Sequence, residues 1–469
     1  MNDPKDGLST PYLPPIVGSA LDLIGNTPMV EVSHLDTGPC RLFLKLENQN
    51  PGGSIKDRVA RAMIQAAETD GSLKPGGTII EATAGNTGLG LAQVATLKGY
   101  KLILVVPDKM AREKILHLRA MGVDVRLTRS DVGKGHPEYY QDMAQTLAQS
   151  IPGSIYVNQF ENPANPYAHE TTTGPELLSQ MGGDIDAIVV GVGSGGTLTG
   201  VGRYMQKHSP KTVMVLADPV GSILCDYVAT GTFGEAGSWI VEGIGEDFIP
   251  DNAQMDLVSK AYSISDRESV DTARLLLKKE GILGGSSAGC LLAAALRYCR
   301  EQTEPKRVVT LVCDTGSKYL TKMFNDFWLA AHGFDGRELH GDLRDLIAKR
   351  YVDGGVVAIG PADTLLTAYN RMRSSDVSQL PVVDHGKLVG ILDESDILAA
   401  VEDDDRDLRF KTPVGEAMTH AVNTLQSTQG VDALPEVFDR DEVALVCEGE
   451  QFLGVITRVD LINHLRMAG

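Results

Sequence analysis

A lysine stands at the start of an expected helix, directly behind a Pro-Gly-Gly turn. The segment reads Asn50-Pro-Gly-Gly-Ser-Ile-Lys-Asp-Arg58, so that Lys56 follows two glycines closely. Basic side chains usually favour the C-terminal end of a helix, where the macrodipole is negative, and glycines allow another group to approach the backbone. On this segment alone, a catalytic amine and a solvated surface lysine are equally good interpretations of Lys56.

Three further segments place small polar residues at the start of an expected helix. They read Thr83-Ala-Gly-Asn-Thr-Gly88, Gly191-Val-Gly-Ser-Gly-Gly-Thr-Leu-Thr-Gly200 and Gly284-Gly-Ser-Ser-Ala-Gly289. The first offers N–H groups and hydroxyls to a carboxylate or a phosphate, and an ordinary helix cap is its alternative. The second predicts a phosphate cradle, with a dinucleotide site as the competing interpretation. The third is either a functional serine turn or a close-packed turn.

Taken together, the four segments contain the parts of a pyridoxal phosphate enzyme. They supply an amine that can form a Schiff base, a phosphate cradle, a carboxylate loop and a neutral serine turn. On these motifs the chain resembles the fold type II pyridoxal phosphate family of cysteine synthase and cystathionine β-synthase. The resemblance spans about residues 15 to 330, and it implies pyridoxal 5'-phosphate as the cofactor.

The resemblance also implies a role for each segment. Lys56 is expected to bind the cofactor covalently, Asn86 to bond its ring hydroxyl, and Ser287 to face its pyridine nitrogen. The residues expected to bind the cofactor phosphate are Gly193, Ser194, Gly195, Gly196 and Thr197. The residues expected to bind the substrate are Thr83, Ala84, Gly85, Thr87, Gln159 and Gly243. Ala84 stands where the family commonly has a serine, which puts one carboxylate hydrogen bond in doubt.

The neutral side chain of Ser287 has a chemical consequence of its own. A carboxylate facing the pyridine nitrogen would keep it protonated and make the ring a deep electron sink, whereas a hydroxyl makes a shallower one. The shallower sink favours β-elimination and β-replacement over racemisation or transamination. Lys56 is then the natural base for the Cα proton and can protonate a poor leaving group, provided that its pKa is lowered.

A later segment, Val241-Glu-Gly-Ile-Gly-Glu-Asp-Phe-Ile-Pro250, resembles the cystathionine β-synthase form of a loop near the active site. Glu242 is the candidate catalytic carboxylate in it, because it can orient the amino group of L-homocysteine or take the proton of its thiol. A helix cap or a surface glutamate is the alternative. The resemblance thus implies that L-serine and L-homocysteine give L-cystathionine and water, a step of transsulfuration and cysteine biosynthesis, with hydrogen sulfide production left open.

Two rival functions remain open at this point. A cysteine synthase would use O-acetylserine and sulfide, but Glu242 and the C-terminal part of the chain favour the lyase. A non-catalytic sensor of an adenosyl ligand would keep its first domain only as a relic, and the complete set of cofactor residues argues against it. No haem is expected, because only about 15 residues, without Cys or His, precede the fold.

The composition excludes several classes of partner and site. The chain has 469 residues, a net charge of -19 and a pI of about 5.0, which argues against nucleic acid or an anionic membrane as the main partner. Its six cysteines are scattered and form no CxxC pair, so neither a disulfide scaffold nor a metal site is predicted. The sequence has neither a targeting segment nor a bilayer-spanning apolar run, and the cytoplasm is the expected compartment.

Strand-like and helix-like segments alternate between about residues 40 and 320. This alternation predicts an α/β fold of two subdomains with parallel twisted sheets. The expected strands include residues 41–46, 78–82, 102–106, 123–127, 187–190, 212–216 and 307–312. Near residue 335 the glycine-rich turns end, and two weakly similar α+β halves follow. We therefore expect a catalytic domain at 1–333, a linker at 334–345, and smaller domains at 346–404 and 405–469.

The two C-terminal halves resemble tandem CBS domains, which form a Bateman module. In the second half, Gly454-Val-Ile-Thr-Arg-Val-Asp460 keeps the pattern in which Thr457 and Asp460 bind an adenosyl ligand, S-adenosylmethionine or an adenine nucleotide. In the first half Asp393 stands where Thr or Ser is usual, and its charge would repel phosphates. A module that only holds subunits together is the alternative. The chain as a whole is expected to form a homodimer or a higher homo-oligomer.

Overall fold

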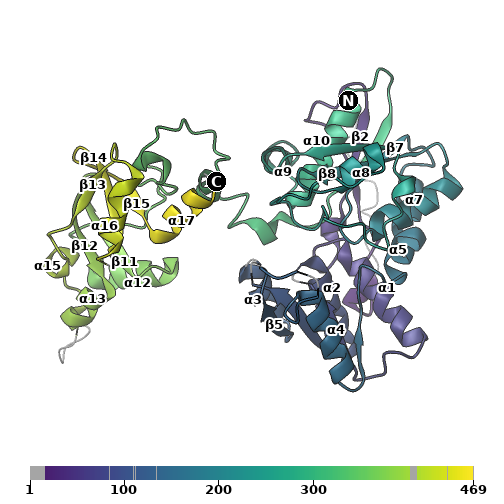
Figure 1. Ribbon diagram of the computed structural model, residues 1–469, viewed down its shortest axis with the longest axis horizontal. Coiled ribbons are helices and arrows are strands. Elements are labelled where there is room, and N and C mark those ends of the chain that lie inside the picture. Colours follow the sequence, from purple (N-terminus) through teal and green to yellow (C-terminus); the bar gives the residue numbers. More distant parts are fainter. Residues whose placement is uncertain are drawn as a thin grey trace, which may run out of the picture. The chain divides into compact units, whose positions relative to one another are not determined.

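The structure of the protein is a computed structural model. It describes residues 16–83, 85–108, 110, 112–133, 135–401, 409–440 and 442–467. The chain divides into two compact units, Met1–Leu320 and Thr321–Gly469 (Figure 1). The expected domain bounds stay a prediction, and the one at residues 404 and 405 lies outside the described residues.

A six-stranded sheet forms the larger core of the first unit, with the strand order β1-β2-β10-β7-β8-β9. Its strands are β1 (Met29–Glu31), β2 (Arg41–Lys45), β7 (Ala187–Val190), β8 (Val213–Pro219), β9 (Lys260–Ile264) and β10 (Arg307–Leu311). Strands β1 and β2 pair antiparallel, and the other neighbours pair parallel. Strand β7 is a continuous run of buried aliphatic residues, as strands in helix-covered parallel sheets usually are.

Several helices belong to this part of the unit. They are α5 (Ala164–Ala168), α6 (Gly174–Gln180), α7 (Gly196–His208), α8 (Leu224–Thr230), α9 (Asp266–Glu280) and α10 (Ser286–Arg300). Helix α9 is capped by the Ser265 hydroxyl, which accepts a hydrogen bond from Glu268 N. Helices α7 and α10 instead follow glycines and receive no side-chain cap from the described residues. Their first N–H groups are therefore available to a ligand.

A four-stranded parallel sheet, in the order β5-β4-β3-β6, forms the second core of this unit. Its strands are β3 (Thr78–Ala82), β4 (Lys101–Pro107), β5 (Asp124–Thr128) and β6 (Ser154–Tyr156), and its helices are α1 (Lys56–Thr69), α2 (Asn86–Lys98), α3 (Arg112–Ala120) and α4 (Tyr140–Ser150). Ile79 packs into the cluster that contains α1 and α2, while Ile80 packs with Ala144 of α4. Successive strand side chains point to opposite faces, so helices cover both faces of this sheet (Figure 1).

The second unit contains a five-stranded sheet in the order β11-β12-β15-β14-β13. Its strands are β11 (Gln379–Asp384), β12 (Lys387–Asp393), β13 (Thr424–Gln426), β14 (Ala444–Glu448) and β15 (Gln451–Ile456). Its helices are α11 (Asp326–Ala331), α12 (Leu365–Ser375), α13 (Glu394–Val401), α15 (Val414–Ala417), α16 (Leu434–Phe438) and α17 (Arg458–Met467). Hairpins β11–β12 and β14–β15 are each followed by a helix, which is the repeated pattern expected from the sequence.

The sequence patterns located these elements closely, and the expected α/β fold with parallel sheets is confirmed. Strand β3 and helix α2 have the expected bounds, and β2, β4, β7 and β10 differ from expectation by a residue at an end at most. All six cysteines are free, and four of them are buried. None of the described helices is long and apolar enough to cross a bilayer.

Candidate active site

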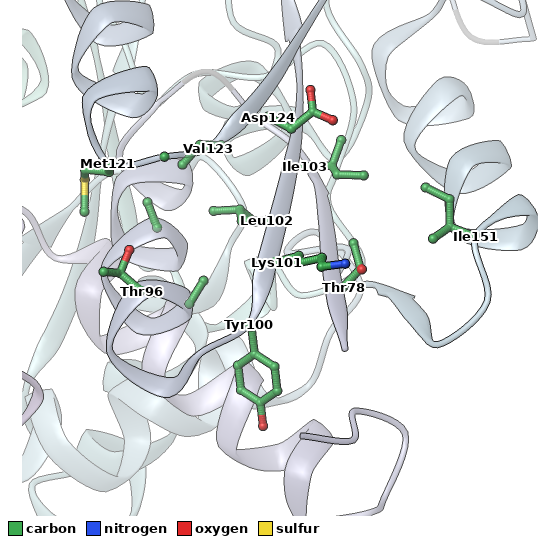
Figure 2. Close-up of a pocket in the computed structure, with 13 residues that line it drawn as sticks. Thr78, Thr96, Tyr100, Lys101, Leu102, Ile103, Met121, Val123, Asp124 and Ile151 are labelled. Carbon is green, nitrogen blue, oxygen red and sulfur yellow. The ribbon is translucent and has the colours of Figure 1, made fainter. Parts of the chain in front are cut away.

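The carboxyl ends of the parallel strands in the first unit border a cavity of about 830 Å³. A smaller hollow of about 450 Å³ lies at the opposite edge of the four-stranded sheet, where Thr78, Lys101 and Asp124 begin β3, β4 and β5 (Figure 2). Ligands of α/β proteins bind at the carboxyl ends of the strands. The larger cavity is therefore the candidate active site, and it contains the predicted segments.

Lys56 is the first residue of α1, and its side chain lines the cavity. The turn before it is tied to the end of β10, because Ile55 N donates a hydrogen bond to the Cys313 carbonyl at 2.9 Å. Burial lowers the pKa of the Lys56 ammonium, and the charges of Cys313, Asp314 and Glu246 only partly oppose this. A lowered pKa increases the share of neutral amine, which is the form that acts as a nucleophile or a base.

The loop between β7 and α7 is shaped for close approach to its backbone. Gly195 has a φ of 82°, in the left-handed region that favours glycine. A Cβ on Gly193 would lie 2.4 Å from the Gly243 carbonyl oxygen, and a Cβ on Gly195 would lie 2.6 Å from Ala253 N. Both positions therefore require glycine. The loop leads into the uncapped N-terminus of α7, where an anion is favoured.

Neutral polar groups line the same loop. Asn165 Nδ2 donates a hydrogen bond to Ser194 Oγ at 2.8 Å, and Thr197 Oγ1 lies 3.3 Å from His169 Nε2. Burial and nearby positive charge keep the pKa of His169 well below its usual range, so its ring is neutral. Asn165 Oδ1 is buried without a hydrogen-bond partner among the described residues. A glycine cradle at a helix N-terminus, edged by neutral donors, fits a phosphate group.

Asn86 begins α2, and hydrogen bonds hold both ends of its side-chain amide. Its Nδ2 donates to Asp314 Oδ2 at 2.8 Å, and its Oδ1 accepts from Lys318 Nζ at 2.7 Å. The Tyr319 hydroxyl donates to the same Asp314 oxygen at 2.7 Å. These contacts fix the orientation of the Asn86 amide at the cavity wall. Its bond to the cofactor ring hydroxyl stays a prediction.

The expected carboxylate loop lies at the end of β3. Thr83, Gly85, Thr87 and Gln159 all line the cavity, and Ala84 lies outside the described residues. Thr87 Oγ1 donates to Gln159 Oε1 at 2.6 Å, and Gly85 N donates to Thr83 Oγ1 at 3.2 Å. The structure thus brings together groups from β3, α2 and the segment after β6, although the bound carboxylate remains a prediction.

Ser287, in the first turn of α10, lines the cavity and is 4% exposed. Burial raises the pKa of the Cys313 thiol to about 12, and the Ser287 hydroxyl partly opposes that rise. The hydroxyl of Ser286 beside it accepts a hydrogen bond from Glu242 N at 2.9 Å. The serine turn therefore contacts both the end of β10 and the loop that carries Glu242.

Glu242 and Gly243 line the cavity from the loop that follows residue 240. The Glu242 carboxylate forms an ion pair with the Lys114 ammonium from α3. Lys114 also lies over the Tyr319 ring, 4.9 Å from its centroid. Two charged side chains thus meet in the cavity that Lys56 also lines.

Sequence reasoning did not single out Lys114, Asp314, Lys318 or Tyr319. The last three follow β10 directly, and polar residues at the carboxyl end of a buried parallel strand are a signal that was available. Lys114 lies inside an ordinary amphipathic helix, and its role depends on packing alone. Within the described residues, no group of three or more His, Cys, Asp or Glu side chains is placed to hold a metal ion.

Known proteins share this architecture and these segments. A family model described as pyridoxal-phosphate dependent enzyme matches residues 20–314, and a CBS domain model matches residues 345–403. A cystathionine beta-synthase of Dictyostelium discoideum is 35% identical to the chain, and the match covers 96% of this chain and 92% of that protein. The chain belongs to the cystathionine β-synthase family. This confirms a pyridoxal-phosphate dependent lyase with a C-terminal CBS domain.

Other relatives match different shares of the chain. A cystathionine beta-synthase of Apis mellifera is 42% identical over 70% of this chain, which is 65% of that protein's length. An O-acetylserine dependent cystathionine beta-synthase from Helicobacter pylori is 37% identical, with a TM-score of 0.61, over 66% of this chain and 98% of that one. A hydrogen sulfide-producing enzyme from Fusobacterium nucleatum is 35% identical, with a TM-score of 0.61, over 65% of this chain and 100% of that one.

Proposed function

We propose that this cystathionine β-synthase family member replaces the hydroxyl of L-serine with the thiol sulfur of L-homocysteine, forming L-cystathionine and water. The observation that supports this most is the ion pair of Glu242 and Lys114 in the cavity of Lys56. A carboxylate and an ammonium together suit the amino and carboxyl groups of a second amino acid. Sulfide, the second substrate of a cysteine synthase, has neither group.

Each of these cavity residues has its own role in the proposed reaction. Bound pyridoxal phosphate supplies an acceptor for the electron pair that remains when the substrate Cα loses its proton. Lys56 takes that proton, because burial lowers the pKa of its ammonium. Gln159 and Thr87, hydrogen-bonded at 2.6 Å, hold the substrate carboxylate. The neutral hydroxyl of Ser287 would face the pyridine nitrogen of the cofactor, where it would favour loss of the β-substituent over racemisation or transamination.

A cysteine synthase is the second candidate function, because the relatives differ in the first substrate. The Helicobacter pylori relative is described as O-acetylserine dependent, and the Fusobacterium nucleatum relative as producing hydrogen sulfide. Serine, O-acetylserine and cysteine all carry a group that can leave from Cβ. The leaving hydroxide of serine requires a proton, whereas acetate does not, so the two functions make different demands on the cavity.

A steady-state screen of these three β-substituted alanines tests the proposal. Each is supplied to the purified protein with L-homocysteine and, separately, with sulfide. We expect cystathionine from serine and homocysteine at a higher kcat/KM than cysteine from O-acetylserine and sulfide. A preference for the second pair would make the protein a cysteine synthase. A colourless protein that turns over none of them would favour the non-catalytic sensor instead.

For the second unit we propose one adenosyl-ligand site, at Thr457 and Asp460. Thr457 N and Oγ1 donate to Asp460 Oδ2 at 2.7 and 2.6 Å, so Thr457, directly before α17, is bonded to Asp460 in the first turn of that helix. In the first half, Asp393 and Asp396 cap each other's backbone N–H groups at 2.9 and 3.0 Å. Two carboxylates there disfavour a phosphate-bearing ligand, which supports at most one occupied site for each chain.

Calorimetry of the full-length protein tests this site with S-adenosylmethionine, ATP and AMP in turn. We expect heat with one of them, and loss of that heat in Thr457→Ala. Ligand changes activity only if it binds two arrangements of the protein unequally. No heat, no thermal shift and no rate change with any of the three would favour a module that only holds subunits together.

We further propose a haem-free, cytoplasmic homodimer or higher homo-oligomer. The six free cysteines suit a reducing compartment. The residues on which the expected absence of haem depends lie outside the described part of the chain. Light scattering measures the assembly state. A haem absorption band in the purified protein would contradict the proposal.

A further inference from the structure

Glu246 lies in the same loop as Glu242, and its backbone is anchored on both sides. Glu246 N donates to Ser222 Oγ at 3.0 Å, and the Glu246 carbonyl accepts from Ile223 N at 3.1 Å. The preceding Gly245 N donates to the Val192 carbonyl at 2.8 Å. The loop is therefore pinned to the ends of β7 and β8, and the Glu246 side chain lines the cavity that contains Lys56.

The surroundings of Glu246 disfavour its charged form. Burial raises the pKa of its carboxyl well above the ordinary value, and the charges of Asp247 and Asp218 add to the rise. Lys56 is the cation that opposes it. Tyr139 and Tyr140, at the start of α4, line the same cavity, and the charge of Glu246 contributes to their raised pKa values. The site thus holds a carboxyl group whose protonated form is favoured, in the same cavity as an amine with a lowered pKa.

We propose that Glu246 is the general acid that protonates the leaving hydroxyl of the first substrate. This assignment rests on the proposed β-replacement. Lys56 takes the Cα proton, a Cα–Cβ double bond forms as the Cβ–O bond breaks with its electron pair on oxygen, and the Glu246 carboxyl delivers a proton to that oxygen to form water. The Glu246 carboxylate and the Lys56 ammonium that remain attract each other and limit the return of water.

The second half of the reaction restores both groups. The homocysteine thiol gives its proton to the Glu246 carboxylate, its sulfur bonds Cβ, and the Lys56 ammonium returns its proton to Cα. Every proton that leaves a residue is thereby regained, and the sum is serine plus homocysteine to cystathionine plus water. Lys56 removes the Cα proton and Glu246 protonates the leaving oxygen. Lys56 therefore does not have to pass the Cα proton on to that oxygen.

The choice of leaving group distinguishes this role from a structural one. Hydroxide is a poor leaving group that requires a proton, whereas acetate leaves as a stable anion. If Glu246 stays protonated throughout the reaction of O-acetylserine, then Glu246→Gln should not disturb that reaction. The single-turnover rate at which each substrate is consumed without homocysteine measures the loss of the leaving group directly. Glu235→Gln, which alters an exposed carboxylate, is the matched control.

We expect Glu246→Gln to slow consumption of serine by about a hundredfold or more, a typical contribution of general acid catalysis. Consumption of O-acetylserine should change by no more than a fewfold. Glu246→Asp, which keeps an acid, should recover part of the serine rate. Infrared spectra of the cofactor-free protein at neutral pH should contain a protonated carboxyl band that is missing in Glu246→Gln.

Each outcome has a distinct meaning. Equal losses with both substrates, or an unchanged carboxyl band, overturn the assignment and make Glu246 a structural residue. A wild-type protein that consumes neither substrate contradicts the proposed function instead. If Glu246→Gln does not fold, the wild-type pH profiles decide. The serine rate should fall as pH rises through the pKa of Glu246 while the O-acetylserine rate does not, and parallel profiles overturn the assignment.

Discussion

The Lys114 ammonium and the Glu242 carboxylate form an ion pair inside the active-site cavity. The side chain of Lys114 is 3% exposed and that of Glu242 is 20% exposed, so both charges are largely removed from water. Removing one partner of such a pair leaves the other as an uncompensated buried charge. Each charge is therefore sensitive to a ligand that offers it an alternative partner.

The first prediction concerns the second substrate. Glu242→Ala should leave the loss of water from serine nearly intact and slow the homocysteine-dependent half-reaction by about ten- to a hundredfold, the scale expected for a positioned carboxylate. Rapid-mixing kinetics of the two half-reactions measure this separately. Lys114→Met and the double variant complete a mutant cycle. Equal damage to both half-reactions in Glu242→Ala would point to a structural role for the pair.

The second prediction concerns the cofactor lysine. Lys56→Ala should abolish almost all turnover and the absorption of covalently bound cofactor, because the other amines at the site, Lys114 and Lys318, are bound to Glu242 and Asn86. The fold should persist, since the side chain faces a cavity and contributes little to a hydrophobic core. Absorption spectra and thermal unfolding check both statements. Lys279→Ala, an exposed lysine in α9, is the control, and wild-type turnover in Lys56→Ala would refute the assignment.

The third prediction concerns the partner of the pyridine nitrogen. Ser287→Asp places a carboxylate at a position that is 4% exposed, and it should keep the nitrogen protonated when cofactor is bound. The rate of β-replacement should then fall, and the share of racemised or transaminated product should rise. Product analysis by chiral chromatography measures the ratio. Ser287→Ala removes the hydroxyl without adding charge, and unchanged kinetics in Ser287→Asp would mean that this residue does not face the ring.

The fourth prediction concerns a buried carboxyl group in β3. Glu81 is fully buried, and neither carboxyl oxygen has a hydrogen-bond partner of good geometry among the described residues. Burial raises its pKa to about 8, although the backbone N–H groups of Gln159, Ala82 and Asn158 partly oppose the rise. The group is thus protonated in the folded protein at neutral pH, next to the segment that carries Gln159.

The sign of its pH effect follows from linkage. The unfolded chain loses the Glu81 proton near pH 4.5 and the folded chain near pH 8, so the folded state binds more protons between these values. Stability from this group is complete below the unfolded pKa and falls as pH rises, until it is lost above the folded pKa. We expect Glu81→Gln to flatten the fall in unfolding free energy between pH 5 and pH 8, measured by denaturant titration. An unchanged slope would contradict the raised pKa of Glu81.

The four glycine- and serine-rich segments could be identified from the sequence because their signal is local. A buried strand, a turn of small polar residues and an amphipathic helix are encoded within about 30 residues. The carboxyl ends of parallel strands meet at one edge of a sheet. The sequence by itself therefore determined the α/β fold, the paired C-terminal halves and the contribution of Lys56, Asn86 and Ser287 to one cavity wall.

Only the tertiary structure decided which charges face each other across that cavity. Lys114 and Glu242 are 128 residues apart in the chain, and Glu246 lines the cavity of Lys56 from a loop attached to the other sheet. The register of α3 and the anchoring of the loop at residues 242–246 depend on how the helices pack on two separate sheets. Local periodicity records which face of an element is buried, but it does not record which partner that face meets. Likewise, the raised pKa of Glu246 results from burial, which exists only in the folded chain.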